Sequence, residues 1–229
     1  MTVEVFSMSD GLADARPRDE EALWRAVAQH EAAHAVSLIE AVRTHPKLNR
    51  PRLLAFEKVV IRRGQGPDYL GSDGISKPIW GEVIGGLPLY EPSESRDLVR
   101  RMQPQRRKEF AEGLILPKVV MLLSGPLSLS LNIAHHRRER YFRYVRSDSG
   151  NFSDYAEAKK LLPDLRMAGL PYALLPIEHC TYVLLLQMRR LIERVGAKLF
   201  EVGELNHDDV CRLIDESQTG IRRLDELLS

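Results

Sequence analysis

The residues His30, Glu31 and His34 have the types and the spacing of the motif His-Glu-x-x-His. Residues four apart on a helix lie on one face, one turn above the other, so both imidazoles can point at one zinc ion. The carboxylate of Glu31 lies beside that face, where it can take a proton from a zinc-activated water without being a ligand itself. The motif therefore predicts metal-assisted hydrolysis with Glu31 as the general base.

The motif requires a helix, and its flanks predict one. Asp19 is a candidate N-cap, and Glu20 and Glu21 place negative charge in the first turn. No glycine or proline interrupts residues 20–42. One helical stripe contains Leu23, Val27, His30, His34 and Leu38. The alternative is a chance match on an amphipathic helix, which composition alone produces in roughly one in a hundred chains of this length.

Two histidines do not hold a catalytic zinc ion by themselves, so a third protein ligand is expected, with water in the fourth position. A metzincin would continue with a glycine and a third histidine, but Ser37 and Glu40 stand at those positions. Without that glycine the helix is expected to continue and to point Glu40 elsewhere, and His45 is expected at the surface. The distant candidates are His135, His136, Asp154, Glu157, Glu178 and His179.

The composition indicates a globular chain of 229 residues, with 44% hydrophobic residues and a net charge of +1. We expect a flexible arm at residues 1–17 and a single domain over residues 18–229. The balanced charge gives no reason to expect a nucleic-acid or membrane partner. Cys180 and Cys211 lack the spacing of a metal site and favour a reducing, cytoplasmic location. No apolar stretch is expected to span a membrane.

The remaining segments predict a mainly helical α+β chain with a small sheet. Residues 56–62 are rich in β-formers and precede a glycine turn, and residues 69–76 can form a second short strand. A buried helix is expected over residues 111–123, broken or kinked at residues 124–126, and others are expected after residue 154 and over residues 176–200. Asn206 is a candidate N-cap of a further helix.

Of two basic clusters, the first, residues 100–108, is interpreted as a solvated helix face rather than a patch for an acidic partner, and the second, residues 137–146, is given no role by the sequence. The second interleaves arginines with Tyr141, Phe142 and Tyr144, a composition that can grip single-stranded nucleic acid. The overall charge balance argues against that function. His207 and Cys211 lie four residues apart, but no other ligand is nearby, so they are interpreted as structural.

The order of these segments resembles the protease domain of the FtsH family, which are membrane-anchored AAA+ zinc proteases. Residues 28–36 match its His-Glu-Ala-Gly-His-Ala motif, with Ala33 in place of the glycine. Residues 58–64 resemble the strand that follows, and residues 122–125 are similar to the start of its Leu-Gly-Gly-Arg-Ala-Ala-Glu segment. Residues 149–154 resemble its Thr-Gly-Ala-Ser-Asn-Asp segment, and residues 191–213 its closing helices.

The resemblance implies a zincin-like peptidase fold, with a small sheet beside the motif helix and a C-terminal helical bundle. It implies that Asp154 is the third ligand of a Zn²⁺ ion. A simple N-cap role for Asp154, or a site completed by Glu157 or Glu178 instead, stays open. A substrate strand is expected to add to an edge formed by Val59, Val60 and Ile61 or by residues 69–76.

The chain departs from that family in three respects. It has no Walker motif or ATPase module and no expected membrane span, and Pro-Leu-Ser-Leu-Ser at residues 126–130 replaces the family's Arg-Ala-Ala-Glu-Glu. We therefore expect a cytoplasmic zinc endopeptidase that cleaves peptides or unfolded segments without ATP, alone or with an unfoldase partner in trans. The alternative is a catalytically degenerate peptidase domain that serves as a protein-interaction or regulatory module.

Overall fold

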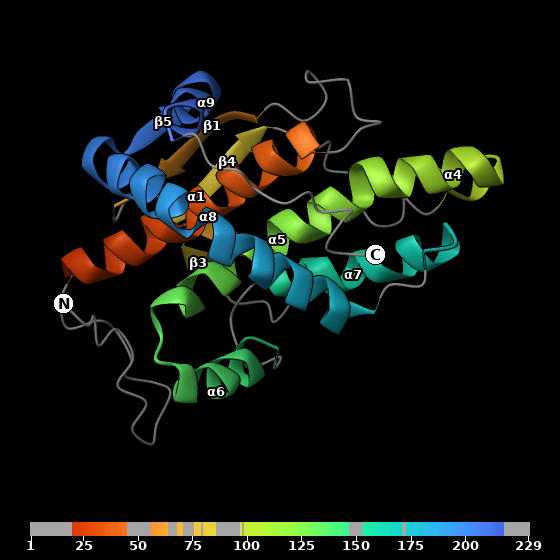
Figure 1. Cartoon of the computed structure of the whole chain (residues 1–229), viewed down its shortest axis with the longest axis horizontal. Coiled ribbons are helices and arrows are strands. Elements are labelled where there is room, and N and C mark those ends of the chain that lie inside the picture. Colours follow the sequence, from red (N-terminus) through yellow and green to blue (C-terminus); the bar gives the residue numbers. More distant parts are fainter. Residues whose placement is uncertain are drawn as a thin grey trace.

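The computed structural model describes residues 20–44, 56–63, 68–70, 76–78, 80–85, 97, 99–146, 153–170 and 173–217. These residues are mostly helical, with a small antiparallel sheet at one end, which confirms the expected α+β class (Figure 1). The arm expected at residues 1–17 and the candidate cap Asp19 lie outside the described residues.

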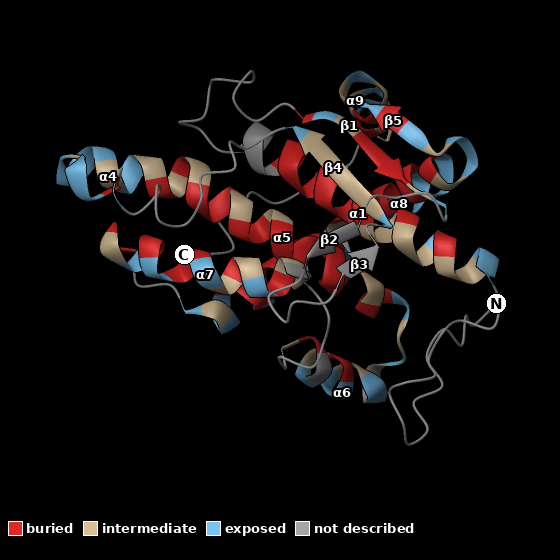
Figure 2. Ribbon diagram, turned by 180° about the vertical axis from the view of Figure 1, so that it is seen from behind, coloured by how far each residue is buried: buried red, intermediate tan, exposed pale blue. Residues whose placement is uncertain are grey.

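Three long helices form the centre of the molecule. Helices α1 (Glu20–Thr44), α5 (Leu116–Leu129) and α8 (Leu174–Val202) pack against one another, and α7 (Ser153–Met167) lies against α5. Their facing sides form the buried core (Figure 2). The run of small residues in α1 lets the neighbouring helices approach closely, because Ala28, Ala32, Ala33 and Ala35 are fully buried.

Of the break or kink that the sequence predicted at residues 124–126, the break does not occur, because helix α5 continues through these residues. It continues α4 (Pro104–Phe110) through a π-helical segment, Ala111–Ile115. Pro117 lies just after this π-helical segment, at the start of α5. Pro126 lies inside the helix and costs about 3 kcal/mol there, but it is buried between neighbouring helices. Burial of the surrounding apolar surface offsets that cost.

The helical run Pro104–Asn132 is long and apolar enough to cross a membrane by length and composition alone, with a mean hydropathy of 1.8. This differs from the expectation that no stretch has that property. Inside the molecule 78% of this apolar window is buried (Figure 2). A helix that is apolar on all sides is also typical of a protein core, and that is how this run is placed here.

The main sheet has three antiparallel strands in the order β4 (Gly81–Gly85), β1 (Phe56–Ile61) and β5 (Glu204–Asn206). Strand β1, expected over residues 56–62, is confirmed. The expectation that Val59, Val60 and Ile61 form an open edge is wrong, because β1 is the central strand. Val59 pairs with Val83 on one side and with Leu205 on the other, so the backbone of β1 has no free side.

Two short strands, β2 (Asp68–Leu70) and β3 (Ser76–Pro78), pair with each other where one strand was expected over residues 69–76. The fold is completed by α6 (His135–Arg146) and by α9 (His207–Asp215). Asn206 caps α9 as expected, because its Oδ1 accepts a hydrogen bond of 2.8 Å from the backbone N–H of Asp209.

Candidate metal centre

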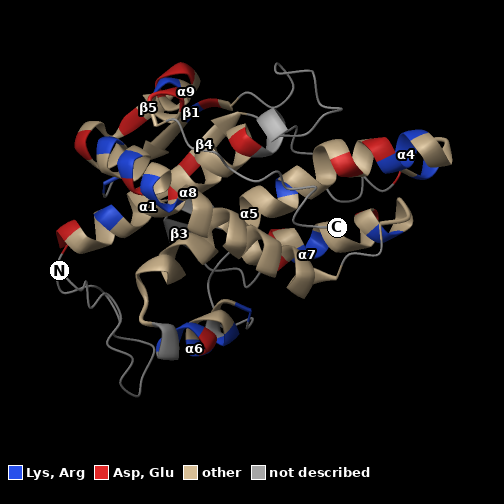
Figure 3. Ribbon diagram, viewed as in Figure 1, with Lys and Arg blue, Asp and Glu red and all other residues tan. Residues whose placement is uncertain are grey.

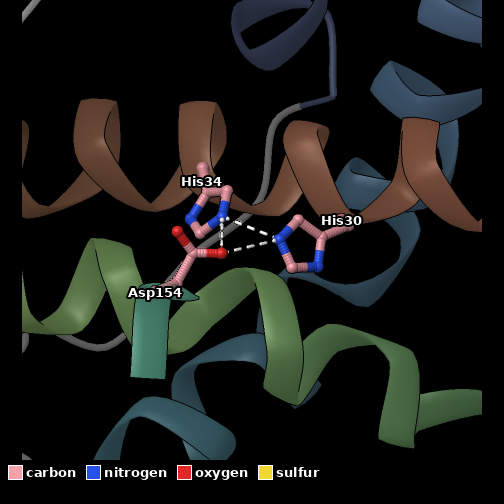
Figure 4. Close-up of side chains that lie close together, drawn as sticks. All are labelled: His30, His34 and Asp154. Atoms are coloured by element: carbon pink, nitrogen blue, oxygen red, sulfur yellow. Dashed lines mark hydrogen bonds and ion pairs between the residues drawn. The ribbon is translucent and has the colours of Figure 1, made fainter. Parts of the chain in front are cut away.

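Helices α1 and α7 bring His30, His34 and Asp154 together (Figure 4). The two histidines lie one turn apart on α1, and Asp154 lies in the first turn of α7, 124 positions after His30. Asp154 Oδ2 lies 3.1 Å from His30 Nε2 and 3.4 Å from His34 Nε2, and the two nitrogens are 3.1 Å apart. Among the described residues this is the one group of three or more potential ligands whose atoms converge.

The triangle formed by these three atoms has the size of one face of a zinc tetrahedron. With zinc–ligand bonds of about 2.0–2.1 Å, ligand atoms at tetrahedral corners lie about 3.3–3.4 Å apart. The three measured sides of 3.1, 3.1 and 3.4 Å agree with that separation to within about 0.3 Å. The residues therefore fit a tetrahedral metal ion with its fourth corner left for water or substrate.

The hydrogen bond made by the other ring nitrogen of His34 leaves its Nε2 available as a ligand. His34 Nδ1 lies 2.6 Å from the backbone carbonyl oxygen of Met121 in α5. A carbonyl can only accept, so Nδ1 carries the proton and the Nε2 of the neutral ring has a lone pair. An outer hydrogen bond of this kind fixes the tautomer and the orientation of a metal-binding histidine.

The charges at this cluster favour a cation between the side chains. Burial alone would lower the pKa of His34, but the hydrogen bond and the negative charge of Asp154 raise it to about 9. Burial alone would raise the pKa of Asp154, but its hydrogen bonds with His30 and His34 hold it well below its usual range. Without a metal the cluster therefore holds a proton at neutral pH, and a bound metal ion would replace that proton.

Glu31 lies on α1 beside the cluster and is not part of the ligand triangle. It is only 7% exposed, and its side chain packs against the start of β4. A Cβ atom at Gly81 would lie 2.5 Å from Glu31 Cγ, so the absence of a side chain there makes room for the carboxylate. Burial raises the pKa of Glu31, although the nearby His30 and His34 oppose this. A carboxylate with a raised pKa beside a metal cluster has the character of a general base.

Helix α5 approaches the cluster at Gly125. A Cβ atom at that position would lie 2.3 Å from His34 Nε2 and 2.6 Å from His30 Nε2. Any side chain there would collide with both ligand atoms and compete with an ion held between them. Sequence reasoning treated Gly125 as a helix breaker and as part of a weak motif. The signal for its role was a glycine inside an otherwise apolar helix, which is usually there for a close approach.

The other candidate ligands whose side chains the structure describes do not join the cluster. The carboxylate of Glu178 is buried and accepts hydrogen bonds from Arg146 and Tyr155. Glu157 pairs with Lys160 on the surface, and His179 is exposed. Glu40 remains on α1, outside the ligand group. The side chains of His45, His135 and His136 lie outside the described residues.

His207 and Cys211 contact each other on α9, with Sγ 3.4 Å from Nε2. No third ligand joins them among the residues that the structure describes. His207 also packs edge-on against the ring of Phe56 in β1. These contacts are in line with the structural interpretation of the pair.

Two tryptophans contact each other near the start of β4. Trp24 and Trp80 have ring centroids 6.4 Å apart in an edge-on contact. Trp24 precedes Glu31 by seven residues, so both lie on the same face of α1, two turns apart. Trp80 directly precedes Gly81 and is 46% exposed. The start of β4 thus joins the candidate general base to an exposed aromatic surface.

Comparisons with known proteins do not assign this chain to a family. No family model matches it, and no curated protein matches it significantly.

Proposed function

We propose that this chain is a zinc-dependent peptidase with a zincin-like domain of the FtsH type. His30, His34 and Asp154 would hold the ion. The observation that carries the proposal is the ligand triangle, whose sides match a zinc tetrahedron although its third corner comes from a helix 124 positions away. The position of Glu31 next to that triangle supports hydrolysis rather than a purely structural metal site.

A zinc ion held there would supply Lewis acidity toward a water molecule and a scissile carbonyl group. Glu31 is placed to accept a proton from an attacking water molecule and would return it to the leaving amine, as the motif predicts. Its buried position and raised pKa support both steps, because a carboxyl group that protonates more readily can return the proton. Met121 holds the His34 ring through its carbonyl oxygen, and Gly81 leaves room for Glu31.

Strand β4 replaces β1 as the edge to which a substrate would add. Among the described strands, β4 pairs only with β1, so the other side of β4 is the candidate edge for an extended peptide. Gly81, at the start of β4, contacts Glu31. A peptide that paired with β4 would therefore pass beside the general base.

The proposal extends to a cytoplasmic enzyme that acts on peptides or unfolded segments without ATP, with an unfoldase supplied in trans for folded substrates. Neither nucleic acid nor a membrane is a proposed partner. Helix α6 contains most of the second basic cluster (Figure 3). Its last arginine, Arg146, pairs with Glu178 inside the molecule, which supports a structural interpretation of at least that residue. Cys180 and Cys211 form no disulfide within the described part of the chain, which fits a reducing compartment.

The first test is the metal content and peptidase activity of the purified protein. Elemental mass spectrometry should find a single zinc ion in the wild type and in Glu31→Gln, and little in Asp154→Ala. Glu31→Gln should lower kcat toward an unstructured peptide by about 10²–10⁴-fold, because the proton acceptor is lost while the ligands remain. Glu157→Gln, at an exposed carboxylate in the same helix as Asp154, is the matched control and should resemble the wild type.

Other outcomes discriminate among the alternatives. A zinc content that is unchanged in Asp154→Ala would mean that another residue is the third ligand. Zinc without hydrolysis of any peptide would favour the second candidate function, an interaction module. The replacement of charged family residues by the largely buried residues 126–130 is the observation that favours that candidate.

A further inference from the structure

The carboxylate of Glu178 is buried where α6, α7 and α8 meet. Glu178 is 5% exposed, near the start of α8. Arg146, the last residue of α6, donates from Nε to its two oxygens at 3.0 and 3.2 Å and also from Nη2. The hydroxyl of Tyr155 in α7, itself fully buried, donates to the same carboxylate. One acidic group thus receives donors from two other helices.

A buried carboxylate is costly unless it is both paired and hydrogen-bonded. The guanidinium fork supplies charge and direction, and the phenol supplies a further donor. Moving any of the three helices would separate these groups and leave a charge uncompensated. The contacts therefore favour one arrangement of α6, α7 and α8.

That arrangement fixes the position of the first turn of α7 relative to its neighbouring helices. Tyr155 directly follows Asp154, and Lys159, one turn later, donates to the backbone carbonyl oxygen of Arg146 at 2.9 Å. The first two turns of α7 are thus attached both to α8 and to the end of α6. Asp154 must meet two histidines on α1, and metal–ligand distances tolerate only about 0.2 Å of error. The position of this first turn consequently decides whether the third ligand reaches the site.

We propose that Arg146, Glu178 and Tyr155 are positioning residues that hold the Asp154 carboxylate at the metal site. None of the three belongs to the ligand triangle, so they act through the backbone of α7. This inference rests on the proposed function, because it requires an ion bound by His30, His34 and Asp154. It also gives Glu178, a candidate ligand by sequence, a different role.

The test compares zinc affinities of the full chain, measured by competition with a chromophoric chelator. Tyr155→Phe removes one hydroxyl and should weaken zinc binding about tenfold, and Glu178→Gln should weaken it up to about 100-fold. Arg146→Lys keeps the charge but loses the fork, so its affinity should lie between the wild type and Glu178→Gln. Thr181→Val is the matched control, because Thr181 is buried on α8 and donates to Ile177 of its own helix at 2.7 Å.

Two further measurements separate positioning from general stability. Affinities are compared at a temperature at which circular dichroism shows every variant folded. The visible absorption spectrum of the cobalt-substituted protein reports ligand geometry directly, and it should change in Tyr155→Phe but not in Thr181→Val. Unchanged affinity and spectrum in Tyr155→Phe and Glu178→Gln would overturn the inference. A wild type that binds no zinc would instead overturn the proposed function, and this inference with it.

Discussion

Gly125 lies at a point where even a methyl group would collide with both histidine nitrogens. We predict that Gly125→Ala lowers zinc affinity by at least about 100-fold, because the added Cβ occupies space within the coordination sphere. The measurement is zinc content after dialysis, together with chelator competition. Gly196→Ala is the control, since its Cβ would lie 3.2 Å from the Gln29 backbone and crowd α1 outside the cluster. Equal zinc affinity in the two variants would contradict the assignment of Gly125.

The cluster also makes the stability of the metal-free protein depend on pH. The pKa of His34 is about 9 in the folded chain and about 6.5 when unfolded. Its contribution is therefore fully present below pH 6.5 and is lost as pH rises toward 9. Urea unfolding of chelator-treated protein should show stability falling by about 1–3 kcal/mol over that window. Asp154→Asn should flatten the profile, and a profile unchanged by that variant would mean that other groups cause it.

At the scale of the elements, patterns within one segment predicted most of the secondary structure. The motif helix, strand β1, the helix after residue 154 and the capped helix after Asn206 all follow from local spacing and caps. The open edge expected at β1 and the break expected at residues 124–126 are both wrong, because each depended on neighbouring elements. Strand β5 has three residues, too few for any periodicity, yet its pairing makes β1 central. Pro126 stays within α5 because burial offsets the local cost of a proline.

The residues of the candidate site also fall into those that local spacing predicts and those that depend on distant elements. His30, Glu31 and His34 follow from spacing on one helix, whereas Asp154 was one of several distant candidates until a family resemblance selected it. Gly125 gave only the general signal of a glycine inside an apolar helix, and Gly81 gave none, because both matter through side chains contributed by another element. Sequence reasoning found the candidate chemical residues by their type, and it missed the glycines that leave space for those side chains.

For the whole molecule, the cluster joins a helix near the start of the described chain to one more than a hundred positions later. An ion bound there stabilises the folded state by mass action, by about 4 kcal/mol at a thousandfold excess over Kd. For a chain of this size we expect removal of zinc to lower Tm by about 10 °C. Differential scanning calorimetry with and without chelator measures this shift, with Asp154→Ala as the control. A chelator effect of equal size in that variant would contradict the assignment.

The contact between Trp24 and Trp80 makes intrinsic tryptophan fluorescence a probe of this part of the molecule. The chain has two tryptophans, and both lie at this contact. Its tryptophan fluorescence, excited at wavelengths that tyrosine does not absorb, therefore originates at this contact near the start of β4. A peptide that covered the exposed Trp80 ring would shift the emission to shorter wavelength, so binding can be followed without a label. In Glu31→Gln the same signal would be recorded at equilibrium, since the bound peptide would stay uncut.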